Sequence, residues 1–212
     1  MGVVGRLVGE MLQRAYATAQ RVGSIGPDHR RARQFRAFGS GSAICFPVTA
    51  LYGERYIRIG AGTIIGPHVT LSAGIAPSHE LAHETVVSIG DRCLIGRGSG
   101  IVAHESIEIG DDVFTGHHIY VTDANHGYED PALPVGRQFG EAKPVMIGSG
   151  SWIGHGAIVL PGAHIGEHVV VGAGSVVTGK LPDYCVAVGS PARVIRRYDP
   201  DDPERGWFPV DE

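Results

Sequence analysis

An aliphatic residue, most often followed by glycine, returns every six positions along much of this chain. One tract comprises Ile59-Gly60, Ile65-Gly66, Leu71-Ser72, Ile89-Gly90 and Ile95-Gly96, and after a slip of two residues it continues with Ile109-Gly110, Thr115-Gly116 and Val121-Thr122. A second tract comprises Ile147-Gly148, Ile153-Gly154, Val159-Leu160, Ile165-Gly166, Val171-Gly172 and Val177-Thr178. A step of six fits neither the 3.6-residue period of a helix nor the period of two of an open sheet.

The step of six suits short strands that are joined by tight turns and that each send one aliphatic side chain into a shared interior. Three such strands form a triangular coil, and successive coils stack at the ordinary strand spacing of about 4.8 Å. The turns explain why glycine, at 32 of 212 residues, is about twice as frequent as usual, because glycine adopts turn conformations that a side chain hinders. The sequence therefore predicts an all-β fold, a parallel β-helix.

Segments outside the repeat divide the chain into three predicted parts. Residues 1–37 form an N-terminal helical segment, 38–192 form the β-helix, and 193–212 form a basic and then acidic tail that we expect to be flexible. Within 3–22, apolar residues recur at helical spacing. We expect this helix to pack on its own or a neighbouring subunit, with a membrane-surface helix as the alternative.

Two segments interrupt the coils, an insert at 72–86 and a loop at 123–142. A loop as long as 123–142 inside a compact domain is usually functional.

Composition narrows the function classes. The formal net charge of -4 gives no general attraction to nucleic acid, and no apolar run approaches the roughly 18 residues of a membrane span. The three cysteines form no CxxC pair, and no secretory pattern opens the chain. We therefore expect a cytoplasmic protein.

The insert contains "HELAH", His79 to His83, which fits the HExxH pattern of zinc peptidases. Pro77 precedes the motif, and "ETVVSIG" returns to strand soon after it. This leaves no room for the long buried helix of such enzymes, so we interpret the motif as a solvated helical turn without a metal.

The stretch "TDANHGYED", residues 122–130, is the better candidate for chemistry. His126 stands at the start of the long loop, and Asp123, Asn125 and Tyr128 bring polar groups beside it that we expect to bind the substrate. An imidazole is the side chain best suited to accept a proton near neutral pH.

Three pieces of the chain resemble the hexapeptide-repeat acyltransferases, specifically the acetyl-CoA-dependent O-acetyltransferases that include the galactoside, maltose, nodulation-factor and streptogramin enzymes. The pieces are "NH" at 125–126, "KPVMIGSGSWIGHGAIVLPGAHIGEHVVVGAGSVVTGKLPD" at 143–183, and "GSPARVIRR" at 189–197. The resemblance implies a left-handed β-helix that assembles as a homotrimer, with each active site between two subunits.

The resemblance also implies roles for individual residues. His126 matches the general base that takes a proton from an acceptor hydroxyl while that oxygen attacks the thioester directly, and Asn125 matches a position near the acceptor. Asp123 would orient His126 or bind an acceptor hydroxyl, and the alternative for it is an Asx turn that starts the loop. The positions that match coenzyme-contacting residues are Trp152, His155, Ala173, Thr178, Arg193 and Arg196.

The chain departs from the family pattern in several places. His155 stands where several relatives have a small hydroxyl residue, Lys180 is shifted by one residue, and insert 72–86 is foreign to the maltose and galactoside enzymes. The identity of the acceptor therefore does not transfer.

Two other functions remain open from the sequence. A zinc enzyme like the γ-carbonic anhydrases shares the fold, but its pattern of three histidines is absent from this chain, and no metal is expected. A non-catalytic trimeric scaffold is the other alternative. Within the leading class, another acyl donor or an amine acceptor is also open.

Overall fold

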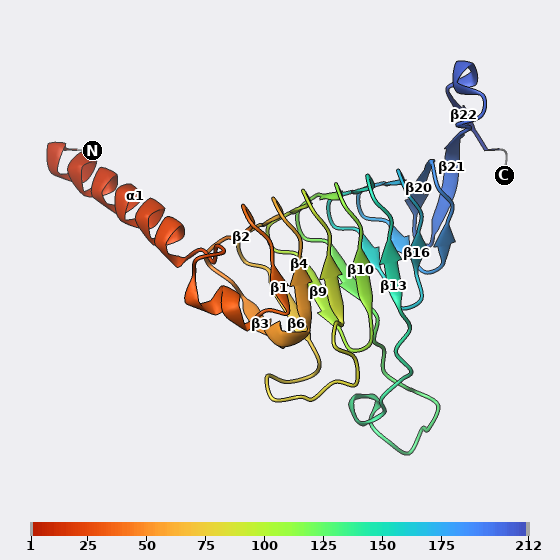
Figure 1. Cartoon of the computed structure of the whole chain (residues 1–212), viewed down its shortest axis with the longest axis horizontal. Helices are drawn as coiled ribbons and strands as arrows, with labels where there is room; N and C mark the ends of the chain where they lie inside the picture. The colour runs from red at the N-terminus through yellow and green to blue at the C-terminus, as the bar shows by residue number, and fades with distance from the viewer. Residues whose placement is uncertain (1, 211–212) are drawn as a thin grey trace.

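The computed structural model describes residues 2–210, and most of them build a three-sided parallel β-helix (Figure 1). Sheet 1 contains β1 (Ala37–Phe38), β4 (Ile57–Ile59), β7 (Val87–Ile89), β10 (Ile107–Ile109), β13 (Val145–Ile147), β16 (His164–Ile165) and β19 (Lys180–Leu181). Sheet 2 contains β2 (Ala43–Ile44), β5 (Ile64–Ile65), β8 (Leu94–Ile95), β11 (Phe114–Thr115), β14 (Trp152–Ile153), β17 (Val170–Val171), β20 (Cys185–Gly189), β21 (Ala192–Tyr198) and β22 (Trp207–Pro209). Sheet 3 contains β3 (Ala50–Tyr52), β6 (Thr70–Ala73), β9 (Gly100–Ala103), β12 (Tyr120–Thr122), β15 (Ile158–Val159) and β18 (Val176–Val177).

Each coil runs from sheet 1 through sheet 2 to sheet 3, and neighbouring coils pair in parallel. The predicted repeat positions face inward and stack in columns. In sheet 1, for example, Ile59 pairs with Ile89, which is followed by Ile109, Ile147 and Ile165 in register, and all five are 3% exposed or less. The prediction of a parallel β-helix with a repeat-built core is confirmed.

Turn geometry accounts for part of the glycine content. A Cβ on Gly154 would lie 2.5 Å from the backbone nitrogen of Ala173 in the next coil, and Gly156 has φ +66°. At other turns this left-handed conformation is held by non-glycine residues, among them His68, His118 and His168. Asn, Asp and His adopt it more often than most residues do, so these histidines have a structural explanation.

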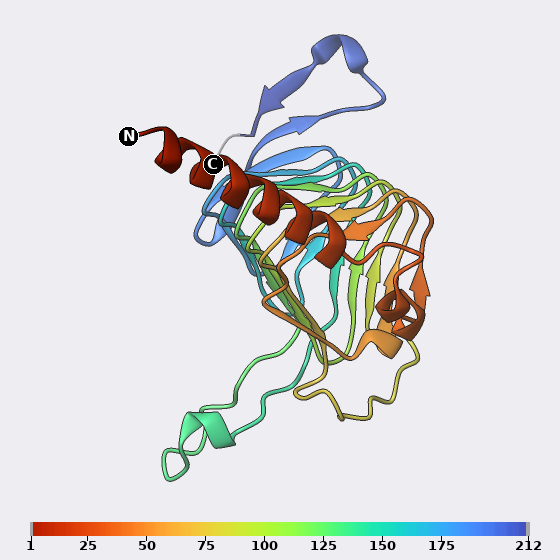
Figure 2. The same ribbon diagram turned by 90° about the vertical axis from the view of Figure 1, so that its left-hand side faces the viewer.

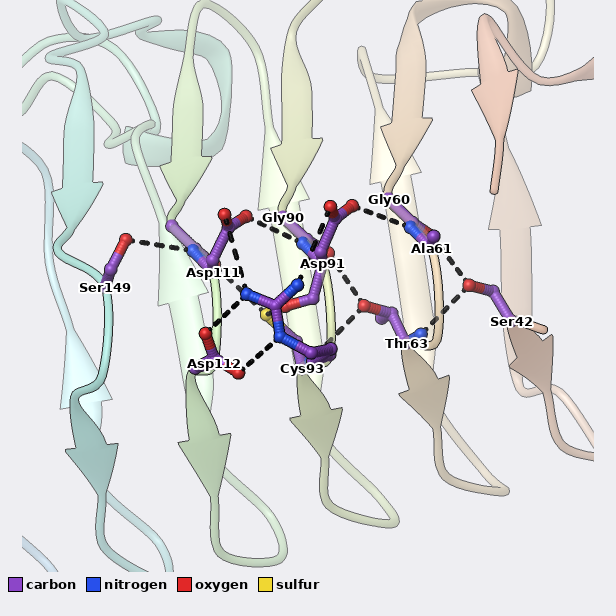
Figure 3. A network of polar contacts seen from close by, with 12 residues as sticks. Ser42, Gly60, Ala61, Thr63, Gly90, Asp91, Cys93, Asp111, Asp112 and Ser149 are labelled. Carbon is purple, nitrogen blue, oxygen red and sulfur yellow. Dashed lines mark hydrogen bonds and ion pairs between the residues drawn. The ribbon is translucent and has the colours of Figure 1, made fainter. Parts of the chain in front are cut away.

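The corner between sheets 1 and 2 is regular and is tied together by polar side chains (Figure 3). The Thr63 hydroxyl donates to Gly90 O at 2.7 Å and accepts from Cys93 N at 3.0 Å. Asp111 accepts from Asp91 N at 2.8 Å through a carboxylate oxygen. Arg92 donates to both carboxylate oxygens of Asp112 on the surface of the same corner.

The corner between sheets 3 and 1 is irregular, and both interruptions leave the β-helix there. The insert connects β6 to β7, and loop 123–142, which contains η3 (Val135–Arg137), connects β12 to β13. Figure 1 shows them as the yellow and green loops below the body. Between them, the two-residue slip of the repeat lies in the short turn between β9 and β10.

The HELAH segment contains no helix, so the expected helical turn is wrong. Residues 79–85 form bends and irregular backbone. The Nδ1 atom of His79 accepts from Ile75 N at 3.3 Å, and Leu81 N donates to the Tyr56 hydroxyl at 3.0 Å. These two hydrogen bonds hold the segment without a helical turn.

The N-terminal segment contains α1 (Val3–Gly23) and η1 (Arg30–Gln34), and η2 (Glu54–Tyr56) follows β3. Helix α1 leads away from the β-helix rather than packing on its own subunit (Figure 1), and in Figure 2 it lies in front of the coils, toward the viewer. No helix among the described residues is long and apolar enough to cross a membrane.

The C-terminal segment is folded as far as it is described, which corrects the expectation of a flexible tail. Strand β21 pairs antiparallel with β20, and β22 returns along β21 after η4 (Pro203–Arg205). Tyr198 and Trp207 stack with ring centroids 5.6 Å apart. Residues 211–212 of the predicted tail, like residue 1, lie outside the described residues.

Candidate active site

A hollow of about 1030 Å³ opens at the corner between sheets 3 and 1, where loop 123–142 leaves the coils. Strands β9 and β12 form its floor, the long loop forms one wall, and Ile75 from the insert reaches its edge. Its polar and titratable lining residues include Asn125, His126, Glu129, Glu141, Lys143 and Thr178, and its aromatic lining residues are Tyr120, Tyr128 and Phe139.

His126 is exposed in this hollow, and one ring nitrogen has a fixed partner. Its Nδ1 lies 3.2 Å from the backbone oxygen of Gln138. Because a carbonyl oxygen only accepts hydrogen bonds, this contact places the proton on Nδ1. The lone pair is then on Nε2, so the ring can accept a proton there.

The two ends of the long loop close on each other around His126. Gly127 N donates to Gln138 O at 2.9 Å, and Gly140 N donates to Asn125 O at 3.1 Å. The side chain of Gln138 donates to Asp130 O and Leu133 O, both at 2.9 Å. Gln138 therefore ties the loop to itself, and no sequence motif identified it.

Contrary to one of the roles expected for it, Asp123 does not point at His126. It is fully buried, and its carboxylate accepts from His104 N, Glu105 N and Ser106 N at 2.7–2.8 Å. These amides belong to the turn between β9 and β10, where the repeat slips by two residues. Asp123 thus anchors the base of the loop on the previous coil and does not line the hollow.

The other expected substrate-binding residues do line the hollow. Asn125 accepts from His126 N at 2.9 Å through its side-chain oxygen, and Tyr128 is 73% exposed. Thr178, expected to contact the coenzyme, lines the opposite side together with Leu160 and Pro161.

Trp152 lies on a different face of the molecule. It points outward from sheet 2 and is 50% exposed, in register with Phe114 on one side and Val170 on the other. Ile64 and Leu94 continue this row of outward apolar side chains. One face of the β-helix therefore carries a continuous apolar row.

The remaining residues expected to bind the coenzyme follow the same side of the molecule as Trp152. His155 and Ala173 lie in stacked turns between sheets 2 and 3, where Gly174 N donates to His155 O at 2.8 Å. Arg193 and Arg196 lie exposed on β21. One subunit therefore does not bring these residues together with His126.

The hollow contains neither a cysteine nor, among the described residues, a group of side chains placed to bind a metal ion. Burial raises the pKa of the Cys93 thiol and raises the pKa of Cys185 to about 11, so both are held as thiols near neutral pH. Within residues 2–210, no three His, Cys, Asp or Glu side chains are placed together to hold a metal ion.

The chain matches two family models, the bacterial transferase hexapeptide (six repeats) at residues 144–179 and the hexapeptide repeat of succinyl-transferase at residues 86–122. A relative from Mycobacterium tuberculosis, named as an acetyltransferase, is 41% identical over 54% of this chain but only 38% of its own length. WbbJ of Escherichia coli K12, named as a lipopolysaccharide biosynthesis O-acetyl transferase, is 32% identical over 68% of this chain and 76% of its own length.

A solved structure gives the same fold. AntD, an N-acyltransferase from Bacillus cereus, superposes with a TM-score of 0.68 at 21% identity, over 86% of this chain and 94% of that chain. The fold is that of the left-handed parallel β-helix proteins, as the resemblance implied. The chain belongs to the hexapeptide-repeat acyltransferase family.

Proposed function

We propose that this protein is an acetyl-CoA-dependent O-acetyltransferase that acts on a sugar or another hydroxylated small molecule. The observation that carries the proposal is His126, whose imidazole faces a large hollow with Nδ1 bound to a backbone carbonyl. An alcohol is a weak nucleophile near neutral pH, so a base of this kind is what its acylation requires.

The proposed reaction is a direct transfer. Nε2 of His126 takes the proton of the acceptor hydroxyl as its oxygen bonds to the thioester carbonyl carbon. The resulting tetrahedral species expels the coenzyme thiolate by breaking the carbon–sulfur bond, and His126 returns the proton to sulfur. The Gln138 carbonyl holds the imidazolium during the step. No acyl-enzyme forms, which fits the buried state of Cys93.

The lining of the hollow supports a polar acceptor with a ring or an apolar part. The exposed rings of Tyr120, Tyr128 and Phe139 offer flat apolar surfaces, while Asn125 and Glu141 offer hydrogen-bonding groups. The name of WbbJ, an O-acetyl transferase of lipopolysaccharide biosynthesis, supports oxygen as the atom that is acetylated.

The division of the expected site residues supports a homotrimer whose active sites lie between subunits. His126 lies at one corner, whereas Trp152 lies on sheet 2, within the continuous apolar row that water disfavours. If the sheet 2 face of one subunit packs beside the loop of the next, Trp152 of one and His126 of the other border one cleft. Exposed guanidinium groups of Arg193 and Arg196 suit the coenzyme phosphates.

We place this activity in the cytoplasm. The three cysteines of the protein are free, which suits a reducing compartment. Acetyl-CoA as the acyl donor suits the same location.

Acetyl-CoA binding, measured by calorimetry, tests the donor assignment. We expect micromolar binding by the wild type and at least about tenfold weaker binding by Arg193→Ala, because each guanidinium–phosphate contact is a charge-assisted bond. No binding at millimolar coenzyme would overturn the proposal.

Mixing two inactive variants tests the shared site. His126→Ala and Trp152→Ala are purified, mixed, and allowed to exchange subunits. If each site takes His126 from one subunit and Trp152 from its neighbour, random mixing regenerates about a quarter of the sites. Activity that stays at the level of the separate variants after verified exchange would place the whole site within one subunit.

A further inference from the structure

Helix α1 exposes an apolar face. Val4, Leu7, Val8, Met11 and Leu12 lie on this face, with Met11 69% exposed and Leu7 61% exposed. Figure 1 shows the helix standing clear of the β-helix. An apolar surface of this extent in water is unfavourable, and it marks an interaction site.

Outside the apolar face, the charged residues of α1 are mostly basic. Arg6, Arg14 and Arg21 outnumber the single acid Glu10, so the helix carries a formal charge of +2. The asymmetry extends further along the chain. Residues 1–37 contain seven of the 18 Lys and Arg and two of the 22 Asp and Glu, a formal charge of +5, which leaves -9 for the other residues.

The borders of the apolar face carry residues that suit a lipid–water boundary. Arg14 follows Leu7 by seven residues and precedes Arg21 by seven, so these three lie along one line at the edge of the face. Tyr16 follows Leu12 by one turn at the other edge and is 54% exposed. Arginine at such a border extends its guanidinium to lipid phosphates, and tyrosine favours the same depth.

We propose that α1 is a membrane-surface anchor that binds an anionic lipid bilayer, with its apolar face at the level where headgroups meet acyl chains. Amphipathic helices of low overall hydrophobicity and basic polar face bind in this way. The cytoplasmic leaflet is the anionic surface that a cytoplasmic protein meets.

Hydrogen bonds connect the end of α1 to the β-helix that contains the candidate active site. Ser24, directly after α1, accepts from Phe46 N at 3.1 Å and donates to Gln20 O at 2.7 Å. Ile25 and Ile44 exchange two backbone hydrogen bonds of 2.9 Å. Because the helix end is bonded to β2 in this way, docking of α1 holds the β-helix close to the bilayer.

Vesicle sedimentation of the full-length chain tests this anchor. The wild type is expected to sediment with vesicles of three parts phosphatidylcholine to one part phosphatidylserine, and to stay in the supernatant with phosphatidylcholine alone. The double variant Leu7→Gln, Met11→Gln should lose at least about tenfold in partitioning, since two apolar side chains no longer insert. Ala17→Gln, on the polar face, is the matched control and should bind like the wild type.

A charge series and the oligomeric mass complete the test. Neutralising Arg6, Arg14 and Arg21 to Gln should weaken binding to the anionic vesicles, as should raised salt. Sedimentation velocity should give the same mass for the wild type and the Leu7→Gln, Met11→Gln variant. Failure of the wild type to bind either vesicle would overturn the proposal, and a drop in mass in that variant would assign the face to a second copy instead. Turnover on a water-soluble acceptor is expected to be unchanged in this variant, so the anchor and the acyl transfer fail independently.

Discussion

Two corners of the same β-helix behave in opposite ways. Between sheets 1 and 2, the connection has four residues in each of the first six coils, and the polar ladder of Figure 3 runs from Ser42 to Ser149 across the first five of them. Between sheets 3 and 1, the connection varies from two to 22 residues and carries the insert, the long loop and His126. A coil needs one corner to be regular so that its strands stay in register.

The regular corner stabilises the fold, whereas the variable corner carries the candidate site. At the regular corner, side chains such as Thr63 satisfy backbone groups in neighbouring coils. At the variable corner, extra residues cost little because they leave and return at one point in the stack, and loop closure depends only weakly on length. Substitutions at the two corners should therefore affect different measurements.

The largest expected effect is at the variable corner, in His126→Ala. Removing a general base should lower kcat by about 10²–10⁴-fold with little change in thermal stability, because the ring is exposed. Steady-state kinetics with acetyl-CoA measures it. His164→Ala, an exposed histidine on sheet 1, is the control and should keep full activity. Equal rates in both variants would remove His126 from the mechanism.

Asp123→Ala tests a residue of the variable corner that we expect to contribute to stability as well as to the position of the catalytic loop. It leaves three backbone amides of the turn between β9 and β10 without their acceptor, so the free energy of unfolding should fall by about 3 kcal/mol. Chemical denaturation measures this loss, and Asp28→Ala, an exposed aspartate, should show little change. A stable but inactive Asp123→Ala protein would instead support the direct substrate role that we first expected.

Thr63→Val should affect stability alone. The buried hydroxyl serves one carbonyl and one amide of the next coil, and their loss should cost about 1–3 kcal/mol. Thr63→Ser keeps the hydroxyl and should recover most of that stability. Changed kinetics in a folded Thr63→Val protein would break the proposed division between the corners.

The smallest expected effect is Gln138→Ala, at the variable corner. Gln138 is a positioning residue, because its side chain ties the loop together while its carbonyl orients His126. A looser ring should lower kcat about 3–10-fold, and the KM for acetyl-CoA should not change. Gln138→Met, similar in length but unable to form these hydrogen bonds, should lose as much. Full activity in both variants would show that the backbone alone holds the ring.

The six-residue period determined the fold because it is a local pattern with a local cause. Each repeat position is one inward side chain, so the columns of Ile59, Ile89 and their equivalents could be read directly from the chain. His126 could be selected in the same way, from its place at the start of a long interruption of that period.

Only the tertiary structure decided what surrounds His126. Asp123 looked like its partner because the two are close in sequence, yet the carboxylate binds amides 17–19 residues earlier in the chain. The actual partner is a backbone carbonyl at Gln138, and a carbonyl carries no side-chain signal. Closure of the loop between residues distant in sequence places it there. Likewise, only the tertiary structure shows that Trp152 lies apart from His126 and that the apolar face of α1 is uncovered. Sequence periodicity records which side chains face inward, whereas contacts between distant segments depend on how the chain returns to itself.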